Sequence, residues 1–287
     1  MLRARIYRAL ARRAPSAREN HRSKVRYLAA DELAWPPDAM HADGDVAYDV
    51  PIAACVYPYG AAYDPGRWHP FTATLRELRD GAGPATYTTS VLHRYYATFR
   101  PSTLLELLFP ADVVAAHPDA ALGKLGTRAY EPILPWSGRL HPPHGEKGLG
   151  VVHGHQGFGP VSDAKGRLEF QRLLDVYRSL EREGFDPTRG RVTGTFVVRG
   201  GAYRFVVGSG FHRLAALSVL GVPSVRARFE PHHLRGVHAE LADRWPLVRR
   251  GVFDAALART FVDHLFDRDR FSEEVAPRVE PTWARAP

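Results

Sequence analysis

The sequence predicts an α+β fold, with mixed helices and strands and a regular core in the second half of the chain. Three patterns predict it. Apolar residues recur with a helical period through 167–183, two β-rich runs follow at 195–198 and 203–207, and a glycine-containing turn then leads into a second helical run. The 287 residues, 45% of them hydrophobic, are enough to bury a sizeable core.

The first 23 residues form a basic N-terminal arm. Residues 1–28 hold nine of the 39 Lys and Arg side chains and only one acidic side chain, so the other 259 residues are electrically balanced. The arm is expected to be a short amphipathic helix that is either solvated or in contact with an anionic membrane surface, nucleic acid or a partner protein. The neutral body argues against a large nucleic-acid-binding face.

Composition favours a cytoplasmic protein, with peripheral membrane contact through the arm as an option. Cys55 is the only cysteine, which excludes an internal disulfide framework and a cysteine-rich zinc site. No apolar run reaches the roughly 20 residues that a membrane-spanning helix needs.

Before residue 150, regular elements are sparse. Residues 24–34 are expected to form a strand and a turn. Residues 35–149, rich in Pro, Gly, Tyr and His, are predicted to be an insertion with helices at 71–80, 90–96 and 102–108.

After residue 150 the elements follow one another closely. The helix over 167–183 ends at Gly184, and the two strands join through Gly200-Gly201. A helix over 211–220 and a strand over 225–229 come next. Residues 232–287 are predicted to be a helical C-terminal extension with a helix over 253–266.

The turn before the second helix has the features of a phosphate site. The first N–H groups of a helix lack intrahelical partners and carry partial positive charge, and glycine lets a phosphate approach the backbone. Arg213 can bind phosphate oxygens bidentately, and His212 can donate one more hydrogen bond. Alternatively, the segment is an ordinary tight turn. The predicted nucleotide-binding residues are Gly208, Ser209, Gly210, His212 and Arg213.

The order of these segments resembles the ParB/sulfiredoxin-like family. The resemblance covers about 168–230, through LEFQRLLDVYRSLEREGF, GTFVVRGGAYRFVV, GSGFHR, LAALSVLG and VPSVRARF. It implies a core made of 24–34 and 150–231, and it implies binding of ATP or CTP with magnesium. Gly210 and Arg213 match the nucleotide-binding boxes of both ParB proteins and sulfiredoxins, and His212 matches the sulfiredoxin form.

Departures from the family pattern narrow the expected activity. Phe211 stands where sulfiredoxins have cysteine, so the nucleophile for sulfinic-acid reduction is missing. Phe211 also replaces the ParB glutamate, and no basic helix-turn-helix follows, which argues against chromosome partition. Relatives that phosphorylate free serine have an acidic residue near the position of Ser209, so an acid or base must come from elsewhere in this chain.

The segment 153–165 is the expected source of that chemistry. Lys165 can neutralise phosphate charge, Asp163 or Glu169 can hold magnesium or accept a hydroxyl proton, and His155 or His153 can act as acid or base. The alternative is that these are ordinary turn and helix-surface residues. No resident metal site is predicted, because the histidines at 141, 144, 153 and 155 match no known ligand spacing.

These observations favour a nucleotide-binding protein that transfers a phosphoryl group from ATP or CTP to a small hydroxyl-bearing substrate. One alternative is a nucleotide-responsive module without turnover. Another is a nuclease-like DNA-binding protein anchored by its arm, whose affinity for DNA would depend steeply on salt and would be lost on deletion of residues 1–28.

Overall fold

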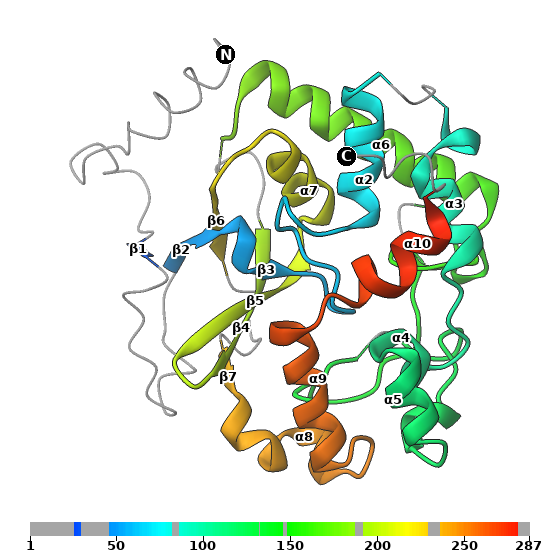
Figure 1. Ribbon diagram of the computed structural model, residues 1–287, viewed down its shortest axis with the longest axis vertical. Coiled ribbons are helices and arrows are strands. Elements are labelled where there is room, and N and C mark those ends of the chain that lie inside the picture. The colour runs from blue at the N-terminus through cyan, green and yellow to red at the C-terminus, as the bar shows by residue number, and fades with distance from the viewer. Residues whose placement is uncertain are drawn as a thin grey trace.

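The computed structural model describes residues 26–29, 46–81, 86–131, 133–145, 148–186, 192–228 and 236–280, and it shows an α+β fold (Figure 1). The predicted basic arm, residues 1–23, lies outside the described residues. Within the described ranges the strands are β1 Arg26–Ala29, β2 Val46–Pro51, β3 Cys55–Val56, β4 Val192–Arg199, β5 Ala202–Ser209, β6 Ser224–Arg228 and β7 Gly236–His238.

The helices cluster around this sheet, and most of them come from two stretches of the chain. The α-helices of the described residues are α2 Pro70–Arg79, α3 Val91–Thr98, α4 Leu104–Leu108, α5 Ala111–Ala116, α6 Asp163–Glu183, α7 Phe211–Val219, α8 Pro246–Arg249, α9 Ala255–Asp267 and α10 Ala276–Val279.

The strands form one mixed sheet in the order β1-β2-β6-β4-β5-β3, with β7 also paired to β4. The predicted hairpin is confirmed, since β4 and β5 pair antiparallel. Strand β4 is buried along nearly its whole length, including Val192, Phe196 and Val197. A strand whose consecutive residues are all buried has both of its faces covered, so β4 lies at the centre of the core.

Two strands of the sheet come from the segment that the sequence predicts to be an insertion. Strand β2 pairs antiparallel with β6, and β3 pairs parallel with β5. Tyr48 and Val50 of β2 are buried and Asp49 between them is exposed, the alternation of a half-buried strand. The sheet therefore combines residues from both sides of position 150.

Helix α6 confirms the helix expected over 167–183 and begins four residues earlier. Ser162 caps it, with its hydroxyl accepting a hydrogen bond from the Lys165 backbone N–H at 3.2 Å. The extra turn brings Asp163 and Lys165 into the helix. Helices α6, α2 and α3 pack together on one side of the sheet, and α7 packs against both α6 and α2 (Figure 1).

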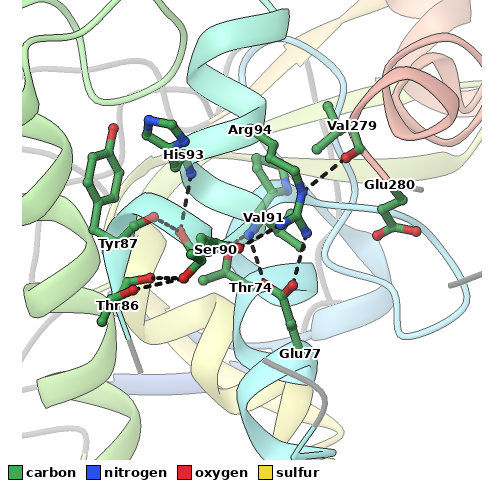
Figure 2. Close-up of polar contacts among 12 residues, drawn as sticks. Thr74, Glu77, Thr86, Tyr87, Ser90, Val91, His93, Arg94, Val279 and Glu280 are labelled. Carbon is green, nitrogen blue, oxygen red and sulfur yellow. Dashed lines mark hydrogen bonds and ion pairs between the residues drawn. The ribbon is translucent and has the colours of Figure 1, made fainter. Parts of the chain in front are cut away.

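The end of α10 is tied to α2 and α3 by a polar network around Arg94 (Figure 2). The Arg94 guanidinium lies 2.9 Å from the Glu77 carboxylate and donates hydrogen bonds to the backbone carbonyls of Thr89 and Val279. Glu77 also accepts a hydrogen bond from the Val91 N–H at the start of α3. One guanidinium thus links the neighbouring helices α2 and α3 to α10, and 185 positions separate Arg94 from Val279.

Candidate functional site

The N-terminus of α7 lies directly after β5, as the phosphate-site prediction requires. Gly210 is the N-cap residue, with φ 87° and ψ 21°, a left-handed conformation that favours glycine. No side chain caps this end of the helix. The first N–H groups of α7 and the positive end of the helix dipole are therefore arranged to receive an anion.

Three predicted residues flank this helix end. The Ser209 hydroxyl lies 2.7 Å from the Thr193 hydroxyl on β4. Gly208 is exposed on β5. Arg213 is half-buried, and this burial lowers the pKa of its guanidinium. The turn thus combines backbone donors, a hydroxyl and a guanidinium within six residues.

A buried ion cluster joins α6 to the first turn of α7. The Glu169 carboxylate, 0% exposed, lies 3.1 Å from Lys165 Nζ, 2.9 Å from Arg172 Nη1 and 2.9 Å from His212 Nε2. The Lys165 side chain is only 2% exposed. Three of the predicted site residues, Lys165, Glu169 and His212, therefore lie in direct contact; we call them, together with Arg172, the Glu169 cluster.

The cluster keeps Glu169 ionised. Burial by itself raises the pKa of a carboxyl group, but the contact with His212 and the charges of His212, Arg172 and Lys165 outweigh it and lower the pKa of Glu169 to about 2. Such a carboxylate is a poor proton acceptor near neutral pH. The position of Glu169 suits it instead to hold His212 and the two cations, Lys165 and Arg172, in place.

The His212 ring is fixed from a second side by α2. It stacks on Phe71 with ring centres 4.8 Å apart and an angle of 12° between the planes. On its other side, Nε2 lies 2.9 Å from the Glu169 carboxylate. Between the Glu169 carboxylate and the Phe71 ring, His212 has little freedom to turn.

His69 is a buried neighbour that the sequence analysis does not single out. Its Nδ1 accepts a hydrogen bond from the Phe71 N–H and caps α2. Burial, with the charges of Arg76 and His212, lowers the pKa of His69 to about 3. The ring is therefore neutral at neutral pH, and its proton lies on Nε2.

Asp163 and His155 contact residues outside the Glu169 cluster. The Asp163 side chain is 62% exposed and pairs with Arg167 at 2.7 Å. His155 stacks on Phe158, and its Nε2 is 3.7 Å from the Glu131 carboxylate, which also contacts His144. The contacts of these two residues are therefore with side chains other than Glu169.

The remaining histidines give no metal centre within the described ranges. His153 Nδ1 lies 2.8 Å from the Ser162 hydroxyl, and the carbonyl of His141 accepts a hydrogen bond from the Glu131 N–H. No group of three or more His, Cys, Asp or Glu side chains among the described residues is placed to hold a metal ion.

Sequence reasoning missed Arg172, Phe71, His69 and Thr193. Arg172 is the one with a readable signal, because it stands three residues after Glu169 and so shares its helix face. The other three reach the site from β4 and α2, through contacts between segments that are remote in sequence.

None of the helices in the described part of the chain is both long and apolar enough to cross a membrane. Comparisons of the chain with models of protein families, with curated proteins and with solved structures find no match.

Proposed function

We propose that the protein binds a nucleoside triphosphate, ATP or CTP, through its phosphates at the N-terminus of α7 and transfers a phosphoryl group to a small hydroxyl-bearing substrate. The observation that carries the proposal is that the Glu169 cluster sits against the first turn of α7. His212 belongs to both, and Arg213 follows it. The first N–H groups of α7, the Ser209 hydroxyl and Arg213 therefore lie within one turn of the chain, a combination that stabilises an anion.

Each residue has a distinct role in the proposal. The N–H groups of the first turn of α7 and the Ser209 hydroxyl donate to phosphate oxygens, and Arg213 neutralises their charge. Glu169 holds His212 in place. Lys165 is too deeply buried for direct substrate contact, and it balances the charge of Glu169 instead.

The two carboxylates expected to hold magnesium do not fit that role. Glu169 is already surrounded by Lys165, Arg172 and His212, and Asp163 is an exposed partner of Arg167. Phosphoryl transfer depends chiefly on positioning the reactants and on stabilising negative charge, so this chain contributes the α7 donors and the nearby cations.

The ParB/sulfiredoxin-like relationship is part of the same proposal. The order α6, β4, β5, α7 and β6 supports it, as does the placement of Gly210, His212 and Arg213 at the β5–α7 turn. In this proposal, strands β2 and β3 are additions to the family's core sheet.

Calorimetric titration of ATP and of CTP, with and without magnesium, tests nucleotide binding. We expect one of them to bind the wild type and Arg213→Ala to weaken that affinity by about tenfold or more, because a charge-assisted phosphate contact is lost. Arg167→Ala, which removes an exposed arginine paired with Asp163, is the matched control. No binding by the wild type, or equal losses in the two variants, would contradict the proposal.

Phosphorus NMR then tests transfer, with free serine and glycerol as hydroxyl-bearing probes. A new phosphate-ester signal that depends on protein and disappears in Arg213→Ala supports the chemistry. A second candidate function is a nucleotide-responsive module. The exposed position of Asp163 and its pairing with Arg167 favour it. It predicts binding with no ester formed from either probe.

A further inference from the structure

The last residue of β5 faces a buried hydroxyl across the hairpin. Ser209 pairs with Thr193 in the β4–β5 register, and their side-chain oxygens lie 2.7 Å apart. Thr193 is 4% exposed, whereas Ser209 is partly open to solvent. The Thr193 hydroxyl therefore contacts Ser209 from the buried side of the sheet.

A local irregularity in β4 creates this pairing. The β4–β5 register shifts between Thr193 and Gly194. A Cβ atom at Gly194 would collide with the carbonyl oxygen of Val206, so the strands can approach this closely only with glycine there. Bulges of this kind redirect neighbouring side chains.

We propose that Thr193 is a positioning residue for the phosphate site, acting through Ser209; this inference rests on the proposed function. Ionised phosphate oxygens only accept hydrogen bonds, so in the complex the Ser209 hydroxyl donates a hydrogen bond to phosphate. Its oxygen then accepts from the Thr193 hydroxyl. Thr193 thereby fixes the Ser209 oxygen and polarises the hydroxyl that meets the ligand.

The test is a double-mutant cycle read by calorimetry with the nucleotide that binds the wild type. Thr193→Val keeps the shape of the side chain and removes its hydroxyl. We expect it to weaken binding about fivefold, close to the effect of Ser209→Ala, because each change removes about one hydrogen bond. The double variant is expected to bind no more weakly than Ser209→Ala alone.

Two further variants separate positioning from strand stability. Thr193→Ser retains a hydroxyl and should bind like the wild type, and Thr195→Val makes the same change two residues along β4 and should leave affinity unchanged. Thermal melting checks that each variant is folded; if Thr193→Val is not, Thr193→Ala takes its place in the cycle.

Equal affinity of Thr193→Val and the wild type overturns the inference while leaving nucleotide binding intact. Additive losses in the double variant also overturn it, because they mean that Thr193 acts without Ser209. Absence of nucleotide binding by the wild type overturns the proposed function and the inference together, so the two failures are distinguishable.

Discussion

Glu169 illustrates at the scale of one residue how a buried charge becomes part of a site. Its carboxylate has no contact with solvent and is surrounded by Lys165, Arg172 and His212. Removing one partner of such a cluster leaves the other charges buried and uncompensated, which costs more than the cluster contributes as a whole. The cluster therefore fixes the relative position of α6 and α7.

The first prediction concerns that carboxylate. We expect Glu169→Gln to lower the free energy of unfolding by about 3–5 kcal/mol, because the buried Lys165 ammonium loses its counter-charge in the interior. Asp163→Asn, on the exposed first turn of the same helix, should cost less than about 1 kcal/mol. Urea denaturation measures both, and similar small losses would show that the cluster does not hold the helices together.

The second prediction concerns pH and His69. The folded protein holds the pKa of His69 at about 3, below its ordinary value of 6.5, so the unfolded chain binds more protons between these values. Stability should therefore fall on acidification from pH 6.5 towards 3, at up to about 1.4 kcal/mol per pH unit. The contribution of Glu169 falls only between its ordinary pKa of 4.5 and about 2.

His69→Asn removes the titrating group while Asn remains a good N-cap for α2. Its stability should depend less on pH than that of the wild type between pH 6.5 and 4.5. His144→Asn, at an exposed position, is the control. The same pH dependence in all three proteins would exclude His69 as its source; denaturant midpoints at each pH provide the measurement.

At the scale of elements, sequence patterns predict the helices and the hairpin of the second half, because helical periodicity and the Gly200-Gly201 turn are local signals. Strands β2 and β3 are short, and their burial depends on partners on β5 and β6. Sequence periodicity does not report pairing between distant segments. The segment predicted to be an insertion therefore turns out to contain two strands of the sheet.

The candidate site likewise has a part that can be read from local sequence and a part that depends on packing between distant segments. The β5–α7 turn is local, and its glycine, serine, histidine and arginine are readable from the sequence. Lys165 and Glu169 meet His212 only because α6 packs on α7, and Phe71 and Thr193 reach the site from other elements. His155 and Asp163 pair with Glu131 and Arg167 instead, and a pattern of neighbouring residues does not report such partners.

The third prediction uses two glycines of this turn. Gly210→Ala places a side chain at φ 87° and should cost about 1–2 kcal/mol of folding free energy. At Gly208 a Cβ atom would make only ordinary contacts, the nearest at 3.6 Å, so Gly208→Ala should cost less than about 1 kcal/mol. Thermal unfolding compares them, and an equal loss would mean that the left-handed cap is not required.

At the scale of the whole molecule, the C-terminal elements are tied to α2, α3 and the β4–β5 hairpin, and α2 packs against both site helices, α6 and α7. Arg94 links α2, α3 and the end of α10 (Figure 2). Arg199 on the hairpin pairs with Asp263 on α9. Trp68, just before α2, donates a hydrogen bond from its indole N–H to Glu280. The C-terminal segment is thus integrated with the N-terminal half.

The fourth prediction tests this integration. Arg94→Ala should lower stability by about 2–3 kcal/mol, because Glu77 loses a charged partner and the carbonyl of Val279 loses a donor. Hydrogen exchange should accelerate most in α10. Arg182→Ala, which removes an exposed pair with Glu183, should alter neither. Uniform exchange rates across the variant would show that the network holds no particular helix.

The pairing of β2 with β6 has a consequence for synthesis of the chain. Val50 pairs with Val225, so more than half of the sequence separates the two partners. On the ribosome, β2 emerges long before the strand that covers its edge. Contacts between such distant residues slow folding, and the early apolar strand remains open to wrong associations in the meantime. We therefore expect the N-terminal half to need protection until β6 has left the exit tunnel.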